Sequence, residues 1–167
     1  YEIPGEPFFG YLRGRYTREE LKTIDDIAFG LGIEVVPCIQ TLGHLAQILQ
    51  WPAYADLRDN DSVLMAGREE TYELIEKMIA AVTEPLRSNR IHLGMDEAHG
   101  IGKGRYREVF GDREPFDIMN EHLDKVGDIC RRRKLKPMIW SDMYFRLGSE
   151  TNNYYDREWS IPQSVVD

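Results

Sequence analysis

The sequence predicts an α/β protein with parallel strands, and three observations lead to this class. Segments with helical periodicity alternate with short apolar runs along the 167 residues, a pattern that places crossover helices between parallel strands. Hydrophobic residues make up 42% of the chain and charged residues 30%, which is typical of a globular domain. The length corresponds to about one domain, so residues 1–167 are interpreted as a single unit.

The first predicted helix follows an opening loop. Residues 1–16 are rich in Gly, Pro and aromatic side chains, and Thr17 stands three residues before Glu20. This spacing is a capping box, which predicts a helix that runs to about Gly30. The apolar stripe of this helix, which is expected to pack on the core, consists of Leu21, Ile24, Ile27, Ala28 and Leu31.

The first predicted strand spans residues 33–40, because Gly32 ends the helix and an apolar run follows it. Residues 41–66 are expected to form a long loop with a short helical piece. A second helix is predicted over residues 68–83, where apolar residues recur on one face and two glutamates favour the first turn.

A third helix lies between two further strands. The strands are predicted over residues 90–95 and 136–141, and the helix from Pro115, which suits a first turn, to about Lys134. His122, midway along this helix, is expected at the surface, and the chain then ends in a predicted loop. A closed (β/α)8 barrel needs about 250 residues. The pattern therefore leaves open a small α/β sheet or a piece of a barrel.

Charge and cysteine content limit the function classes. A net charge of −8 argues against nucleic acid or an anionic membrane as the main partner, and the chain has no apolar run of eighteen residues. Cys38 and Cys130, in a predicted strand and a predicted helix, are expected to be buried free thiols. Free thiols and the absence of a visible signal peptide favour the cytoplasm.

Each predicted strand ends in polar residues, found in the segments 40–44, 96–99 and 140–144. The carboxyl ends of parallel strands meet at one edge, where α/β enzymes hold their catalytic groups. The middle segment carries Asp96 and Glu97, two adjacent carboxylates. Each disfavours the ionised form of the other, and burial penalises both. Such a pair at a strand end therefore indicates chemistry rather than stability.

The adjacency of the two acids favours one glycosidase mechanism over another. Direct attack with retention needs two carboxyls about 5–5.5 Å apart on opposite sides of the sugar. Neighbours in sequence flank the same side of a ligand. Asp96 and Glu97 suit substrate-assisted hydrolysis, in which one acid protonates the leaving oxygen while the other orients a nucleophile that belongs to the substrate.

Three segments resemble motifs of glycoside hydrolase family 20, the β-N-acetylhexosaminidases. His92–Glu97 is similar to the family's His-x-Gly-x-Asp-Glu signature, and Pro37–His44 resembles its strand that ends in Pro-Gly-His or Leu-Gly-His. Ile139–Asp142 resembles the next strand, which carries a pocket-wall tryptophan. Gln40 and Leu42 stand where many members have Asp and Pro, a departure that points to the family's hexosaminidase D branch.

The resemblance implies removal of terminal β-linked N-acetylglucosamine or N-acetylgalactosamine with retention, and no cofactor. It implies that Glu97 is the general acid and base and that Asp96 orients the 2-acetamido group. Further substrate contacts are expected from His44, Trp140, Asp142, Tyr144 and His99, with His92 and Gln40 supporting them.

The resemblance also implies a partial (β/α)8 barrel, with about three parallel strands that correspond to barrel strands 3–5. The family's sugar-binding arginine on the first strand and its later aromatic and acidic residues have no counterpart here. Residues 1–167 are therefore expected to be a central segment of the barrel, inactive alone and prone to self-association through its open edges.

Two alternatives stay open. Asp96, His99 and His44 could bind a divalent metal in an α/β-barrel hydrolase or isomerase. The chain could instead be a non-catalytic, carbohydrate-binding or structural fragment. The favoured interpretation requires no metal.

Overall fold

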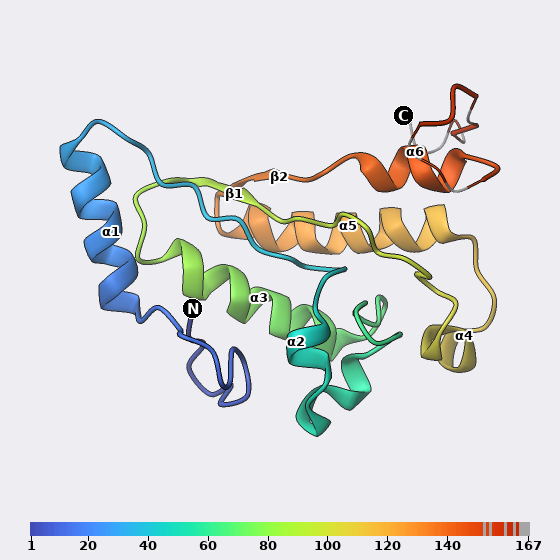
Figure 1. Cartoon of the computed structure of the whole chain (residues 1–167), viewed down its shortest axis with the longest axis horizontal. Coiled ribbons are helices and arrows are strands. Elements are labelled where there is room, and N and C mark those ends of the chain that lie inside the picture. The colour runs from blue at the N-terminus through green and yellow to red at the C-terminus, as the bar shows by residue number, and fades with distance from the viewer. Residues whose placement is uncertain (152, 154, 159, 162, 164–167) are drawn as a thin grey trace.

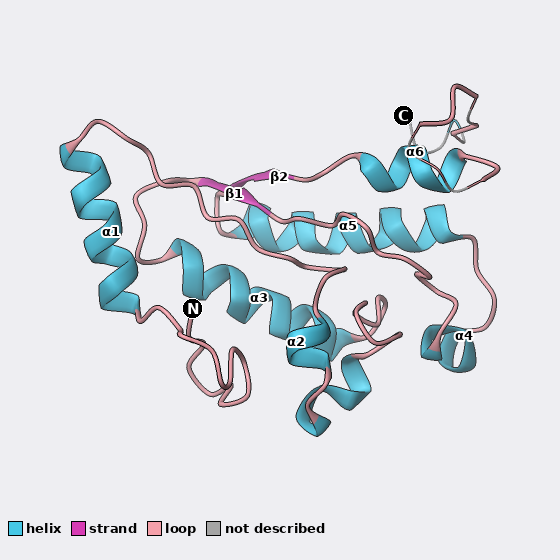
Figure 2. Cartoon of the chain, viewed as in Figure 1, coloured by secondary structure: helices cyan, strands magenta, loops and turns pink. Residues whose placement is uncertain are grey.

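The structure is an α/β arrangement in which helices flank a small parallel sheet (Figures 1 and 2). This computed structural model describes every residue except 152, 154, 159, 162 and 164–167. Strand β1 (Arg90–His92) pairs in parallel with strand β2 (Lys136–Met138). Both strands begin where the sequence predicts and both are shorter than predicted; β1 ends before Gly94 and Met95, whose φ values of 70° and 71° interrupt the extended backbone.

The predicted strand over residues 33–40 is an extended segment with a single parallel bridge, between Cys38 and His92. The backbone N–H of His92 donates to Pro37 O at 2.9 Å, and that of Ile39 donates to His92 O at 2.9 Å. The segment thus lies on the other side of β1 from β2. The prediction of a full strand is wrong, because the three-residue β1 offers few partners for pairing.

The three long helices confirm the predicted helical segments, and the predicted loop over residues 41–66 contains two short helical turns. Two further helices were not predicted from the sequence, namely α4 (Arg105–Phe110) and α6 (Asp142–Gly148). The remaining elements are α1 (Arg18–Gly30), α2 (Ala46–Leu49), the 3₁₀ helix η1 (Pro52–Leu57), α3 (Glu69–Thr83) and α5 (Pro115–Arg132).

Helix α1 begins as predicted but exposes much of its apolar stripe. The Thr17 hydroxyl accepts from Glu20 N at 3.1 Å, and Glu20 Oε2 accepts from Thr17 N at 2.8 Å, which completes the capping box. Ile27 is 61% exposed. The buried side chain of α1 is instead Asp25, which pairs with Arg87 from the loop after α3. An ion pair, rather than the apolar stripe, therefore holds α1 at this point.

Helices α3 and α5 lie on one side of the strands, and their apolar faces form the main core with β1 (Figure 1). None of the described helices is long and apolar enough to span a membrane. All three residues of β2 are exposed, and so is Cys38. The expectation of two buried thiols therefore holds for Cys130 and is wrong for Cys38, because Cys38 lies on the uncovered face of the sheet.

Candidate active site

The three polar strand ends meet at one edge of the sheet. The backbone N–H of Thr41 donates to Leu93 O at 3.1 Å, and that of Trp140 donates to Gly94 O at 3.0 Å. The segments that follow the bridge at Cys38, strand β1 and strand β2 therefore run side by side. The three predicted polar segments thus meet at this edge, although not all of their side chains do.

Asp96 and Glu97 are linked by the imidazole of His44. Its Nε2 lies 3.2 Å from Asp96 Oδ2 and 3.4 Å from Glu97 Oε2. Gln40 also reaches Asp96, because its Nε2 donates to Asp96 Oδ1 at 2.8 Å. The Asp96 side chain is 23% exposed and that of Glu97 is 45% exposed. Asp96 is thus the more firmly held acid, and Glu97 the more accessible one.

Backbone strain concentrates around these residues. His44, Met95 and Glu97 have φ values of 55°, 71° and 45°, in the left-handed region that residues other than glycine rarely adopt. The turn at Met95 ends the strand alternation, so that both carboxylates face one side. Gly43 packs so tightly that a Cβ there would lie 2.6 Å from Asp96 O. Only glycine allows this approach.

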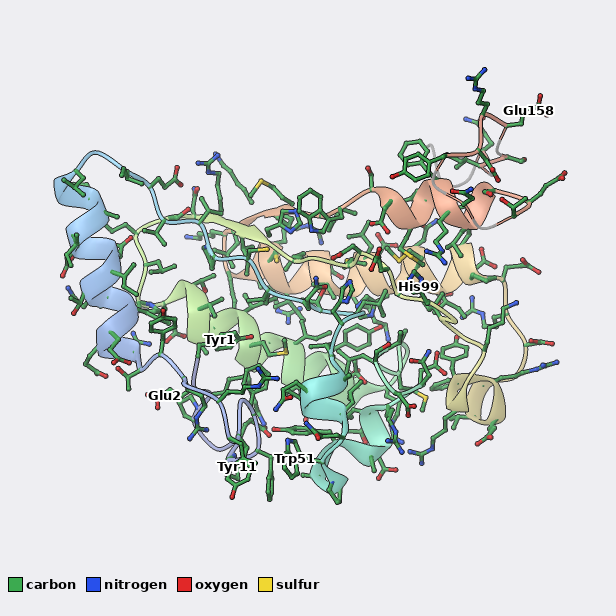
Figure 3. All side chains as sticks on the ribbon, in the orientation of Figure 1. Tyr1, Glu2, Tyr11, Trp51, His99 and Glu158 are labelled. Carbon is green, nitrogen blue, oxygen red and sulfur yellow. The ribbon has the colours of Figure 1, made fainter. Side chains whose placement is uncertain are left out.

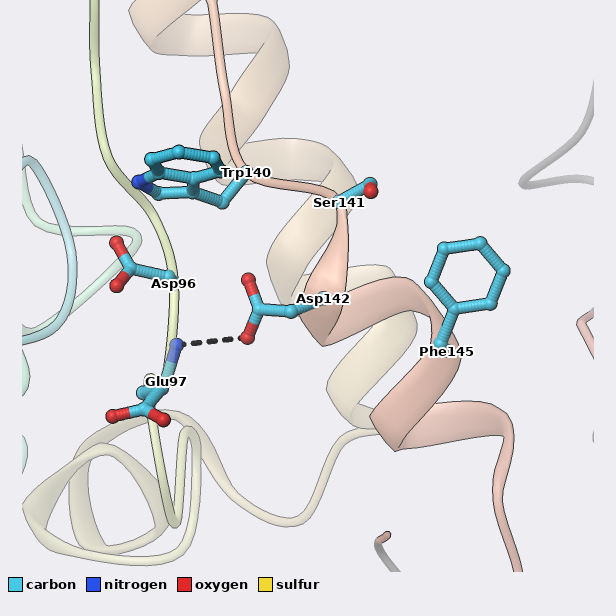
Figure 4. Close-up of a pocket in the computed structure, with 6 residues that line it drawn as sticks. All are labelled: Asp96, Glu97, Trp140, Ser141, Asp142 and Phe145. Carbon is cyan, nitrogen blue, oxygen red and sulfur yellow. Dashed lines mark hydrogen bonds between the residues drawn. The ribbon is translucent and has the colours of Figure 1, made fainter. Parts of the chain in front are cut away.

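A cavity of about 440 Å³ opens beside the carboxylates, a size typical of small-molecule sites (Figure 4). Figure 4 shows the Trp140 ring next to Asp96 and the Asp142 carboxylate facing Glu97. The lining residues are Asp96, Glu97, Trp140, Ser141, Asp142 and Phe145. The cavity therefore combines acidic groups with an apolar aromatic wall.

Two contacts position the groups opposite the acid pair. The Trp140 ring is 53% exposed and packs on His92, with ring centroids 4.7 Å apart. Asp142, at the start of α6, accepts from the backbone N–H of Glu97 through Oδ2 at 3.1 Å. Its Oδ1 is buried without a hydrogen-bond partner in the described part of the chain. Such unsatisfied groups are rare in protein interiors and call for an explanation.

Tyr144 and His99, two predicted substrate contacts, are not among the residues that line this cavity. The Tyr144 hydroxyl donates to Asn120 Oδ1 of α5 at 3.2 Å, and burial raises the pKa of this phenol. His99 (Figure 3) has its Nε2 3.4 Å from Arg146 Nη1. The structure therefore does not bring these two side chains to the acid pair.

The metal alternative needs Asp96, His99 and His44 around one ion. His44 does contact Asp96, whereas His99 lies beside Arg146. Among the described residues, no group of three His, Cys, Asp or Glu side chains is arranged to hold a metal. The proposed ligand set is therefore not assembled.

Asp59 is a buried carboxylate that the sequence analysis did not single out. Its side chain accepts from the backbone N–H groups of Gly102, Gly104 and Tyr106 at 2.7, 3.1 and 2.9 Å. Gly102 and Gly104 belong to the loop that follows Glu97 and Tyr106 to the first turn of α4, so Asp59 connects this loop and α4 to the segment after η1. No local pattern marks this residue, because these three donors to its side chain are all more than forty positions away.

His122 was predicted at the surface, and this prediction is wrong. The side chain is fully buried on α5. Tyr72 Oη lies 3.2 Å from its Nδ1, and Thr41 O lies 3.0 Å from its Nε2. One signal was available in the sequence, since Ile118 and Val126 stand four positions on either side of His122 and share its face. The helix periodicity therefore places His122 inward.

The free energy of unfolding should fall between pH 6.5 and about pH 4 because of His122. Burial lowers the pKa of this imidazole from 6.5 to about 4, so only the unfolded chain binds its proton in that interval. Stability is then lost as the pH falls, by on the order of 3 kcal/mol. Denaturant unfolding at pH 7, 5.5 and 4 measures the effect. His122→Phe should show a shallower pH dependence, and an unchanged one would contradict the assignment.

Comparison with known proteins identifies relatives along most of the chain. A model of the glycosyl hydrolase family 20 catalytic domain matches residues 10–164. Hexosaminidase D from Bos taurus is 30% identical over 151 residues, which cover 82% of this chain and 44% of that protein. Hexosaminidase D from Homo sapiens is 31% identical over 152 residues, which cover 84% and 31%. The chain thus spans less than half the length of these relatives.

Solved structures show the same fold. A β-N-acetylhexosaminidase from Bacteroides fragilis matches with a TM-score of 0.70 at 24% identity, over 96% of this chain and 35% of that chain. The N-acetyl-β-hexosaminidase of Streptomyces plicatus matches with a TM-score of 0.63 at 23% identity, over 79% and 26%. With the family model covering nearly its whole length and two relatives at 30% identity or more, the chain belongs to glycosyl hydrolase family 20.

Proposed function

We propose that the full-length protein containing this chain removes terminal, non-reducing β-linked N-acetylglucosamine or N-acetylgalactosamine by retaining, substrate-assisted hydrolysis. The observation that carries the proposal is the adjacent pair of Asp96 and Glu97, joined by His44 on one side of a cavity walled by Trp140. The membership in family 20 and the hexosaminidase D relatives support the same activity.

The first half of the reaction breaks the glycosidic bond. The carbonyl oxygen of the substrate's 2-acetamido group attacks C1 while the bond to the leaving oxygen breaks, and Glu97 gives its proton to that oxygen. Asp96 accepts a hydrogen bond from the acetamido N–H and stabilises the positive charge of the cyclic oxazolinium. Gln40 and His44 orient Asp96 for this task. Its lower exposure fits a group that positions rather than transfers a proton.

The second half opens the oxazolinium. Glu97, now a carboxylate, takes a proton from a water molecule that attacks C1 on the face of the departed group. The bond from C1 to the acetamido oxygen breaks, and the sugar leaves with its original β configuration. The exposure of Glu97, 45%, fits a group that must meet both the leaving oxygen and water. The Trp140 ring forms the wall against which the acetamido group would pack.

We further propose that the chain corresponds to strands 3–5 of a (β/α)8 barrel. Cys38, His92 and Met138 form one row across the three parallel segments. In a closed barrel, residues of one such row point to the interior. Here Cys38 is exposed and Met138 is 37% exposed. An uncovered interior row and open edges support both the barrel segment and the self-association predicted from the sequence.

The activity is tested with 4-nitrophenyl β-N-acetylglucosaminide and its galacto epimer, on the full-length protein. At least one should release nitrophenol, and a thiazoline that mimics the oxazolinium should inhibit strongly. The isolated 167-residue chain should show no turnover, because much of the sugar-binding surface lies elsewhere in the barrel. The matched control is 4-nitrophenyl β-glucoside, which lacks the acetamido nucleophile. Equal hydrolysis of this glucoside would contradict substrate assistance.

A further inference from the structure

The buried imidazole of His122 connects α3 and α5 to the loop that carries His44. Gly67 N donates to Tyr72 Oη at 3.1 Å, Tyr72 Oη lies 3.2 Å from His122 Nδ1, and His122 Nε2 lies 3.0 Å from Thr41 O. His122 does not line the cavity beside Asp96 and Glu97, and its hydrogen bond to Thr41 O is the contact that leads toward the site.

The partners of the two His122 ring nitrogens determine the direction of each hydrogen bond. A backbone carbonyl can only accept, so His122 Nε2 carries the hydrogen and donates to Thr41 O. Nδ1 then has a lone pair and accepts from the Tyr72 hydroxyl, whose oxygen accepts from Gly67 N–H. Each polar atom in this series of hydrogen bonds, from Gly67 N to Thr41 O, has a partner, and the neutral His122 ring has a single tautomer.

Thr41 connects the His122 hydrogen bond to residues 41–44, the segment that carries His44. Its backbone N and its Oγ1 both donate to Leu93 O, at 3.1 and 2.9 Å, just before the Asp96–Glu97 turn. Two residues further on, Gly43 is pressed against Asp96 O, and His44 holds a φ of 55°. The His122 donor fixes the peptide plane from which this strained loop departs. Strained backbone persists only where surrounding contacts over-determine it.

An apolar residue would fill the His122 position without the cost of burying an imidazole. Fully satisfied buried polar networks, in return, restrict the interior to one arrangement. We propose that His122 is a positioning residue, which holds residues 41–44 so that His44 lies between Asp96 and Glu97. This inference rests on the proposed hydrolysis, because it assigns the loop geometry a role in that reaction.

The test compares His122→Phe with Val126→Ala in the full-length protein. Both remove core contacts of α5, since Val126 is also fully buried and lies one turn away, but only the first removes the donor to Thr41. For hydrolysis of 4-nitrophenyl β-N-acetylglucosaminide, we expect His122→Phe to lower kcat about tenfold with KM changed less than about twofold. His122→Gln, which can still donate to Thr41 O, should restore most of kcat. Val126→Ala should leave kcat unchanged.

Amide hydrogen exchange of residues 41–44 is a second readout that needs no substrate. Exchange there should be faster in His122→Phe than in the wild type and in Val126→Ala. If His122→Phe does not fold, Tyr72→Phe replaces it, because it removes the donor to Nδ1 and should also speed exchange in the loop. Equal exchange and equal kcat in the His122 and Val126 variants would overturn the inference. If the wild type hydrolyses no β-N-acetylhexosaminide, the proposed function fails, and the exchange pattern alone decides whether His122 positions the loop.

Discussion

Replacing Glu97 with glutamine is expected to lower kcat/KM of the full-length protein about 1,000-fold on substrates with poor leaving groups. Glutamine can neither give a proton to the departing oxygen nor take one from water. The Asp142 carboxylate binds the backbone N–H at position 97, so the new side chain should keep its place. The loss would therefore report the missing proton transfer rather than a displaced loop.

The leaving-group dependence tests this assignment. Steady-state rates on 4-nitrophenyl β-N-acetylglucosaminide and on an alkyl or sugar glycoside should diverge in Glu97→Gln, because nitrophenolate leaves without help from an acid. Glu108→Gln, an exposed substitution on α4, is the matched control and should change neither rate. An equal loss on good and poor leaving groups would argue against Glu97 as the proton donor.

Replacing Asp96 with asparagine should lower kcat by about 100- to 1,000-fold. The carboxylate accepts from Gln40 Nε2 at 2.8 Å and contacts His44. Its two oxygens are therefore held in place to accept a hydrogen bond from the acetamido N–H of the substrate. Asparagine lacks the negative charge that stabilises the oxazolinium and offers one acceptor oxygen where the carboxylate has two. The nucleophile of the substrate would then be poorly oriented.

This loss should be similar for good and poor leaving groups, which separates the role of Asp96 from that of Glu97. The measurement is kcat on both substrate types, with Asp61→Asn, a fully exposed position, as the control. Affinity for the thiazoline inhibitor should fall in parallel with kcat, since the inhibitor resembles the charged intermediate. Nearly full activity of Asp96→Asn would refute substrate assistance.

Local signals predicted the elements whose sequences are strongly patterned. The capping box at Thr17 and the periodicity of α3 and α5 depend on residues three or four positions apart, and these helices form as expected. The two missed helices are short. Helix α6 follows the Trp140 segment and packs on α5 through contacts such as Tyr144 to Asn120. A seven-residue segment is too short to show a hydrophobic periodicity that would predict such packing.

The exposed positions that the sequence predicted as buried share one cause. Cys38 and Ile27 belong to apolar patterns that predict a covered face. Periodicity states which residues share a face, and it does not state whether another element covers that face. In the described chain, the main core lies on the side of α3 and α5.

The candidate site also has residues that the sequence predicts and residues that only the structure identifies. Asp96 and Glu97 stand together in the sequence, and their adjacency favours substrate assistance over direct attack. His122 had a local signal in the apolar residues four positions on either side of it, whereas Asp59 was missed because its side chain binds backbone groups more than forty positions away. The residues around Asp59 in the sequence carry no sign of these distant partners.

The sequence by itself determined the three long helices, the starts of β1 and β2, the edge at which the polar segments gather, and the adjacent acid pair on which the proposed chemistry rests. These properties are local, because they depend on spacing along the chain. Only the tertiary structure decided that His44 lies between the two carboxylates, that Tyr144 and His99 lie away from them, and that His122 is buried beneath the loop. Such placements depend on how segments distant in sequence pack, and packing energies belong to the assembled fold rather than to any one segment.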